Sequence, residues 1–297
     1  MSVDTARTGW REARTRRGIQ LLAALCLAAL AGCLSPSGTH PPQASDWAFQ
    51  ILETDHATVH SEPGVSQEDS REVGILFENG YRVVGGDLGY PAKRPQLYVY
   101  ASEQRMYEDL LTRWGYPTWV REVHTVPRMH RDYIEWIPPG QHQDIAFITH
   151  EYSHRIIEQL AGLNSQINFK WLDEGLAEYE GQEALAQLFP AAAHSKAEAR
   201  QRLLAGSSAS GTLIPFFEMT TERQWDEQIQ HGSQLAYPEA WAALDYLVGR
   251  YGMARVKGVL VLIGTGKRFP EAFREIYGFT VDQFEASFRT FLSATSM

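Results

Sequence analysis

Hydrophobic and polar residues follow two different patterns along the chain, and the pattern changes near residue 143. In the front half, residues 68–84 and 103–114 have apolar positions at helical spacing. Residues 96–101 and 130–137 instead alternate apolar and polar side chains, which is typical of β-strands. We therefore expect a sheet with helices here, and we expect the 130–137 strand at an edge where an extended peptide can add as a further strand.

From residue 143 onward, apolar residues recur at helical spacing almost throughout. Gly162, Gly252 and Gly278 mark segment ends, as glycine often does. The predicted helices span residues 143–161, 171–189, 195–205, 234–251, 253–264, 269–276 and 280–294. The fold class predicted by the whole pattern is α+β, with a small N-terminal α/β sheet part (46–142) and a largely helical C-terminal lobe (143–297).

The first 45 residues predict where the protein works. Five arginines precede an uncharged apolar run over residues 18–32, which is typical of an export signal. The run ends in Leu-Ala-Gly-Cys, which resembles the bacterial lipobox and implies lipidation of Cys33. An uncleaved anchor or an ordinary cysteine is the alternative. We expect residues 1–32 to be a lipoprotein signal peptide and the Pro- and Ser-rich residues 33–45 to be a flexible tether.

This reading predicts an exported domain, residues 46–297, that is lipid-anchored to the bacterial cell membrane or outer membrane. The only cysteines are Cys26 in the signal and Cys33, so the mature domain is expected to have no disulfide. The formal net charge of the whole chain is −9 at pH 7. This acidity argues against nucleic acid as a partner, because nucleic-acid binding usually requires a basic surface.

The strongest chemical signal is His150-Glu151-Tyr152-Ser153-His154, an HExxH motif on a predicted helix. Residues four apart differ by about 40° around a helix axis, so the two histidines share a face and converge on one ion. Glu151 lies about 100° from His150, beside the metal, where it can act as a general base. The motif therefore predicts a catalytic zinc site.

Such a site needs a third protein ligand and an open fourth position. The metzincin pattern fails, because Ile157 and Leu160 stand where it requires Gly and His. Glu174 lies 20 residues after His154 on a second predicted helix, which fits the gluzincin pattern. Glu178 follows one turn later on the same face, where it can accept the N–H of a ligating histidine.

The block from residue 144 to residue 179, with its phrase Trp-Leu-Asp-Glu-Gly-Leu-Ala-Glu-Tyr, resembles the gluzincin, or peptidase MA-like, superfamily that includes thermolysin and the zinc aminopeptidases. The resemblance implies one zinc ion per chain, held by His150, His154 and Glu174, with Glu151 as the base. It also implies an oxyanion donor, for which Tyr237 is the first candidate and His231 the substitute. No Gly-Ala-Met-Glu-Asn motif precedes His150, so an endopeptidase is expected rather than an aminopeptidase.

The predicted function is therefore zinc-dependent hydrolysis of peptide bonds in a peptide or protein substrate at the bacterial cell envelope. Two alternatives stay open. One is hydrolysis of another amide, such as a cell-wall peptide. The other is a non-catalytic binding or assembly lipoprotein that retains the peptidase fold, although the intact Glu151 argues against it because a structural zinc needs no neighbouring base.

Overall fold

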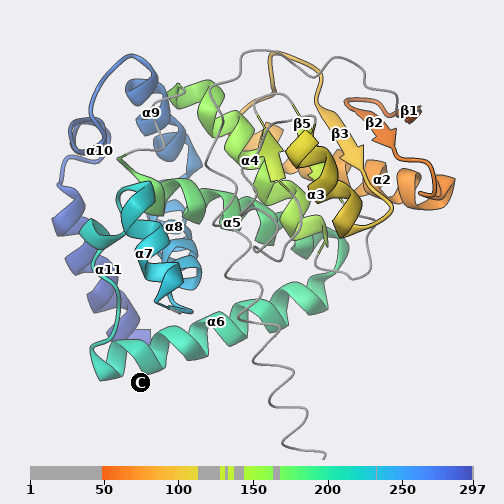
Figure 1. The fold of residues 1–297 in the computed structure, drawn as a ribbon. Helices are drawn as coiled ribbons and strands as arrows, with labels where there is room; N and C mark the ends of the chain where they lie inside the picture. Colours follow the sequence, from red (N-terminus) through yellow and green to blue (C-terminus); the bar gives the residue numbers. More distant parts are fainter. Residues whose placement is uncertain are drawn as a thin grey trace, which may run out of the picture.

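The structure is a computed structural model of the 297-residue chain. It describes residues 49–112, 128–130, 133–136, 144–162, 168–231 and 233–295. The predicted signal peptide, the tether and Cys33 lie outside these residues. In the described part, the sheet lies on one side together with α2 (Gln67–Asp87) and α3 (Glu103–Thr112), and the C-terminal helices lie on the other side. Helices α4 (Asp144–Ala161) and α5 (Lys170–Leu188) lie between them (Figure 1).

Five strands of the described residues form one mixed sheet in the order β1-β2-β3-β5-β4. They are β1 (Gln50–Glu53), β2 (Thr58–Ser61), β3 (Gln96–Val99), β4 (Arg128–His130) and β5 (Tyr133–Trp136). The pairs β2–β3 and β3–β5 are parallel, while β1–β2 and β4–β5 are antiparallel. This arrangement places β1 and β4 at the two edges of the sheet.

The expectation of one strand over residues 130–137 is wrong in detail. His130 ends β4 and Tyr133 begins β5, and the two strands pair antiparallel, with His130 opposite Tyr133. Alternating polar and apolar residues fit either arrangement, because each strand of an antiparallel pair alternates. The edge position remains correct for β4.

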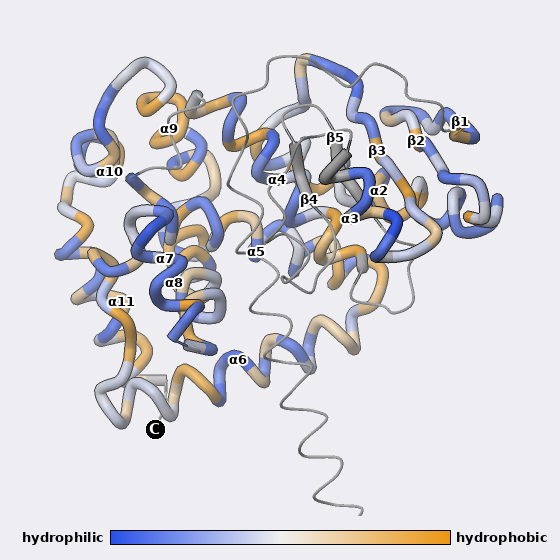
Figure 2. Tube along the Cα trace, viewed as in Figure 1, coloured by the Kyte–Doolittle hydropathy of each residue, from blue (hydrophilic) through white to orange (hydrophobic). Residues whose placement is uncertain are grey.

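The helices of the back half are α4 (Asp144–Ala161), α5 (Lys170–Leu188), α6 (Pro190–Ser210), α7 (Glu222–Gln230), α8 (Ala236–Tyr251), α9 (Met253–Gly264), α10 (Phe269–Tyr277) and α11 (Val281–Thr295), with a 3-10 turn, η4, at Phe216–Glu218. Six of the seven predicted helices of the back half agree with the observed ones within two residues at each end, whereas α6 is longer than predicted and α7 was not predicted. Gly162, Gly252 and Gly278 have φ values of 85°, 82° and 81°, so glycine suits each of these segment ends. The apolar run of α9 stands out in Figure 2, and its Val256, Val259 and Leu260 are buried. No helix of the described part is both long and apolar enough to cross a membrane.

Helix α5 is the central element of the fold, because it packs against both α4 and α8. Two of its glycines make these contacts close. A Cβ atom on Gly175 would lie 2.5 Å from the carbonyl oxygen of Ala240 in α8, and one on Gly181 would lie 2.5 Å from that of Ala146 in α4. These distances leave no room for a side chain, so glycine allows the three helix backbones to approach each other.

The C-terminal helices bury an aromatic core against the start of α5. Trp171 stacks on Phe216 with 4.5 Å between ring centroids, and Phe284 lies 6.0 Å from Trp171. Trp171 is fully buried, as expected for a packed aromatic residue rather than one lining a cleft. This packing fixes the first turn of α5, which Glu174 directly follows.

Candidate metal centre

The candidate metal centre begins with two histidines on α4. His150 and His154 lie one turn apart on the same face of the helix, as their spacing requires. Their Nε2 atoms are 3.1 Å apart, and the ring planes cross at 81°. Both residues are buried, with 7% and 6% of their surface exposed. The two imidazoles therefore direct one nitrogen each towards α5.

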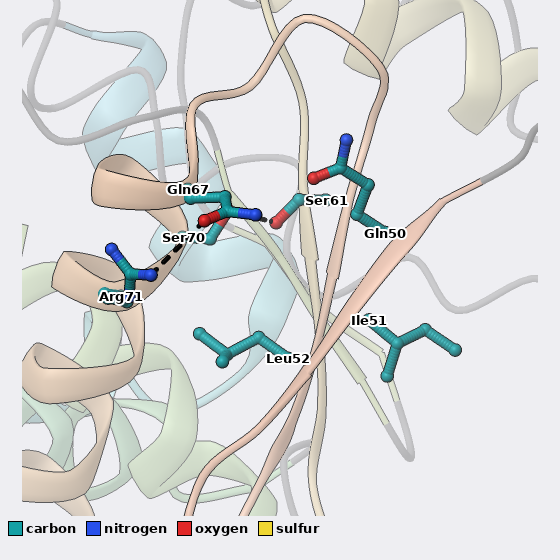
Figure 3. Close-up of a pocket in the computed structure, with 7 residues that line it drawn as sticks. All are labelled: Gln50, Ile51, Leu52, Ser61, Gln67, Ser70 and Arg71. Atoms are coloured by element: carbon teal, nitrogen blue, oxygen red, sulfur yellow. Dashed lines mark hydrogen bonds between the residues drawn. The ribbon is translucent and has the colours of Figure 1, made fainter.

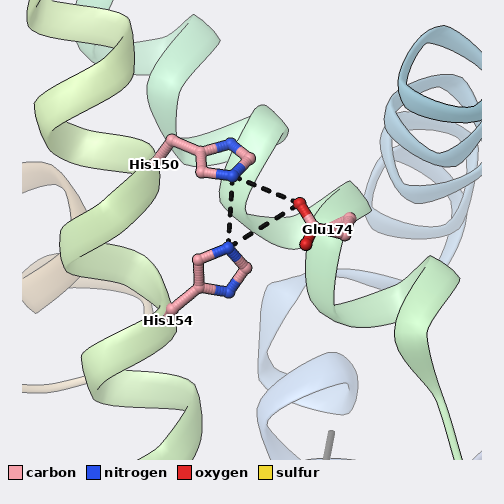
Figure 4. Close-up of side chains that lie close together, drawn as sticks. All are labelled: His150, His154 and Glu174. Atoms are coloured by element: carbon pink, nitrogen blue, oxygen red, sulfur yellow. Dashed lines mark hydrogen bonds and ion pairs between the residues drawn. The ribbon is translucent and has the colours of Figure 1, made fainter. Parts of the chain in front are cut away.

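Glu174 of α5 completes the group (Figure 4). Its Oε2 atom lies 3.2 Å from Nε2 of His150 and 3.7 Å from Nε2 of His154. Zinc with ligands at 2.0–2.1 Å in tetrahedral geometry needs ligand atoms about 3.3–3.4 Å apart. The three observed separations bracket this value. The donor set and its spacing thus fit a zinc ion with three protein ligands.

Each histidine also has a carboxylate on its other ring nitrogen. Asp173 Oδ1 lies 2.9 Å from Nδ1 of His154, and Glu178 Oε1 lies 3.3 Å from Nδ1 of His150. The hydrogen bond between His154 Nδ1 and Asp173 favours the tautomer that leaves the Nε2 lone pair for a metal, whereas Glu178 is within ion-pair distance of His150 Nδ1 without hydrogen-bond geometry. Burial lowers the pKa of His154, but Asp173 and Glu174 raise it more. Glu178 lies where its spacing predicts, whereas Asp173 was not foreseen.

The other oxygen of Glu174 contacts a buried lysine that the sequence reading missed. Lys170 Nζ lies 2.6 Å from Oε1 of Glu174, and the Lys170 residue is 0% exposed. Burial alone would raise the pKa of Glu174, but Lys170 and then His154 lower it well below its usual range. Glu174 is therefore ionised at neutral pH, as a metal ligand needs to be. The sequence did contain a signal for this contact, because Lys170 and Glu174 are four residues apart and so lie on the same face of one helix.

Glu178 is itself held by α6. Its Oε2 accepts a hydrogen bond from Nη2 of Arg200, and Nζ of Lys196 lies 3.7 Å from the same oxygen. The Arg200 guanidinium lies over the ring of Trp241 in α8, 4.9 Å from the centroid. The support of His150 thus extends through α5 and α6 to α8.

The base predicted by the motif, Glu151, follows His150 on α4 and is only partly buried. The ligands, in contrast, are nearly inaccessible. A carboxylate that remains partly accessible next to a buried metal site can reach a water molecule there.

Of the two candidate oxyanion donors, Tyr237 is the one next to the site. Its ring centroid lies 6.3 Å from that of His150, and its ring packs edge-on against Trp225 of α7 at 4.9 Å. His231 is exposed and forms the C-terminal cap of α7. The geometry therefore favours Tyr237 over His231.

A separate hollow of about 140 Å³ lies between β1 and the start of α2 (Figure 3). Ser61 and Ser70 hydrogen-bond to each other in it at 2.7 Å, and Arg71 donates to Gln67 at 3.2 Å. No His, Cys, Asp or Glu is among the described residues that line it. The hollow is therefore not a candidate metal site.

Comparison with known families agrees with this geometry. A family model for the Peptidase MA superfamily matches residues 84–294, which is more than half of the chain. The chain belongs to the Peptidase MA superfamily. The predicted resemblance and its α+β fold are confirmed, and the candidate His-His-Glu cluster lies within the matched residues. No curated protein matches the chain.

Two solved structures are similar to the chain at low sequence identity. An M1 zinc metallopeptidase from Deinococcus radiodurans has a TM-score of 0.44 and 14% identity, over 82% of this chain and 50% of that one. Native leukotriene A4 hydrolase from Saccharomyces cerevisiae has a TM-score of 0.47 and 14% identity, over 80% of this chain and 37% of its own. The chain thus spans half or less of the length of these proteins.

Proposed function

We propose that this protein is a zinc-dependent endopeptidase of the bacterial cell envelope, with one zinc ion per chain. The observation that carries the proposal is the convergence of His150, His154 and Glu174 at separations of 3.1, 3.2 and 3.7 Å, next to Glu151 in the HExxH motif. Three protein ligands leave a fourth position open, which is the arrangement of catalytic rather than structural zinc.

Bound zinc supplies two things, namely polarisation of the scissile carbonyl and acidification of a water molecule. Glu151 would accept a proton from a water molecule at the site as the water oxygen adds to the carbonyl carbon. Tyr237 donates a hydrogen bond to the oxygen that becomes negatively charged. The carbon–nitrogen bond then breaks, and Glu151 returns the proton to the leaving amine.

The substrate is proposed to bind in extended form along β4. This strand is at the edge of the sheet and contacts α4, the helix that carries the HExxH motif. An edge strand has backbone N–H and C=O groups available to pair with a further strand. Binding through the backbone suits cleavage within a chain, and the absence of a Gly-Ala-Met-Glu-Asn motif before His150 argues against a dedicated site for a free amino terminus.

The envelope location rests on residues 1–45. Their arginines, the apolar run and the lipobox-like end at Cys33 support export and lipid anchoring. Labelling of the native chain with a radioactive fatty acid, compared with a Cys33→Ala variant, tests this part by itself. Label in the parent and none in the variant is the expected result, and label in neither would refute the anchor.

The catalytic proposal is tested by metal content and turnover on residues 34–297. About one zinc per chain is expected in the parent and little in His154→Ala, because removing a ligand removes the metal. Internally quenched peptides with both ends blocked should be cleaved by the parent and not by Glu151→Gln. No zinc in a folded parent offered the metal would refute the site. Zinc without turnover on any peptide pool would favour the non-catalytic binding protein.

A further inference from the structure

Lys170 is the first residue of α5 and is completely buried, yet it carries an ammonium group. Burying a charge costs several kcal/mol unless it is paired. Lys170 Nζ has three carboxylates around it, Glu174 at 2.6 Å, Glu222 at 3.2 Å and Asp173 at 3.5 Å. The shortest of these contacts is to the candidate metal ligand.

The two oxygens of Glu174 have different partners. Oε1 is bound by the ammonium of Lys170, and Oε2 faces Nε2 of His150 at 3.2 Å. The Lys170 contact therefore determines which oxygen is presented to a metal. It also opposes coordination by both oxygens at once, because Oε1 would have to leave the ammonium.

The backbone at the start of α5 is fixed as well. The N–H of Lys170 donates to the carbonyl of Thr220 at 2.8 Å, and that of Trp171 donates to the carbonyl of Met219 at 2.9 Å. These bonds join the first turn of α5 to the segment that leads into α7. The lysine is thus anchored at its backbone and at its ammonium, and it has little freedom to release Glu174.

We propose that Lys170 is a positioning residue, which holds Glu174 as a one-oxygen metal ligand and keeps the site formed before metal binds. The inference rests on the proposed zinc site and assigns to it a residue outside the HExxH and ligand motifs. By bonding to Oε1, the ammonium also withdraws electron density from the carboxylate of Glu174. A bound zinc ion would therefore be a stronger Lewis acid than one held by a carboxylate without an ammonium partner.

A purely structural role predicts something different. In that case Lys170 would serve to join α5 to α7 through Glu222, which lies 3.2 Å away. Glu222→Gln removes the negative charge from the Lys170–Glu222 pair and leaves the Lys170–Glu174 contact in place. It is therefore the matched control for substitutions at Lys170.

The experiment measures zinc affinity by competition with a chromophoric chelator, and records the visible spectrum after cobalt(II) loading, for the full chain. Lys170→Met should weaken zinc binding about 10- to 100-fold, the usual effect of losing a partner of a ligand, and should change the cobalt spectrum. Lys170→Arg, which keeps the charge, should recover part of the affinity. Glu222→Gln should retain the parent affinity and spectrum.

Thermal unfolding of each variant shows whether it is folded. Should Lys170→Met not fold, Lys170→Gln replaces it, since it keeps an N–H donor without the charge and should still weaken zinc binding. Parent affinity and spectrum in the folded Met or Gln variant would overturn the inference, as would an equal loss in Glu222→Gln. A parent that binds no zinc would instead refute the proposed function together with this inference, so the two failures are distinguishable.

Discussion

Replacing Asp173 by asparagine tests whether the carboxylate behind each histidine supports metal binding. Asp173 is fully buried, with Oδ1 at 2.9 Å from His154 Nδ1 and Oδ2 at 3.5 Å from Lys170 Nζ. Asparagine has only one oxygen. If the asparagine oxygen faces His154, the amide NH2 group faces the ammonium of Lys170. If the oxygen faces Lys170, the NH2 group faces the Nδ1 proton of His154. Either orientation sets one donor against another.

The expected loss follows from the contact geometry. Mutating a partner of a metal ligand costs about 10- to 100-fold in metal affinity, or about 1.4 to 2.7 kcal/mol. Asp173→Asn should lie at the upper end, because its contact is short and the side chain is 0% exposed. Glu178→Gln should lie at the lower end, since its contact with His150 is 3.3 Å and its side chain is 12% exposed. The ranking is as informative as the size of the effect.

Zinc affinity is measured by competition with a chromophoric chelator, with thermal unfolding followed in parallel. Asp226→Asn is a suitable control. Burial, with Glu222 and Glu174, raises the pKa of Asp226 to about 6 while Lys170 lowers it, so Asp226 belongs to the same charged region. In the described structure it is not a partner of either histidine. An unchanged zinc affinity in a folded Asp173→Asn variant would refute this reasoning, as would an equal loss in Asp226→Asn.

Three further outcomes follow from the structure. Glu151→Gln should retain zinc and lose about 10²- to 10⁴-fold in kcat, and an active variant in a peptide assay would rule out Glu151 as the base. Tyr237→Phe should lower kcat about 10²- to 10³-fold with little change in KM or zinc content, and an unchanged kcat would exclude it as the oxyanion donor. Burial raises the pKa of Glu239 to about 8, although the Ile214 N–H and Arg289 lower it, so this carboxyl is neutral when folded and ionised when unfolded at pH 7. The resulting destabilisation is absent below about pH 4.5 and grows until about pH 8. Glu239→Gln should therefore raise the free energy of unfolding by a few kcal/mol at pH 8 but hardly at pH 4.5, and equal urea midpoints with the parent at pH 8 would contradict this.

The long helices could be predicted because each buries one face against the core. Short elements could not. Helix α7 has nine residues, and Trp225 and Ile229 are its two apolar positions, four residues apart, which is too few to define a helix over the window that periodicity requires. Strand β1 has four residues and none is fully buried, so alternation does not mark it. Helix α6 extends five residues beyond its predicted range at each end, because it is largely exposed and has few buried positions to define its limits.

The members of the candidate metal cluster could be predicted for a different reason, which is that helix geometry alone pairs them within each helix. His150 and His154 are neighbours on one helix face, as are Glu174 and Glu178 on another. The residues that support them depend on tertiary packing. Asp173 reaches His154 only because α5 crosses α4 at this point, and Arg200 reaches Glu178 only because α6 folds back along α5. No spacing within a single segment contains this information.

Gly175 shows how packing and chemistry meet in one motif residue. It directly follows Glu174 and has no side chain to contribute, yet a Cβ atom there would lie 2.5 Å from the carbonyl oxygen of Ala240. Ala240 is one turn beyond Tyr237 on α8, so the close approach that Gly175 permits also determines how near Tyr237 lies to His150. A side chain at this position would have to separate α8 from α5, and thereby Tyr237 from the candidate metal centre. The glycine of the Glu-Gly pair therefore helps to set the geometry of this centre as much as the glutamate does.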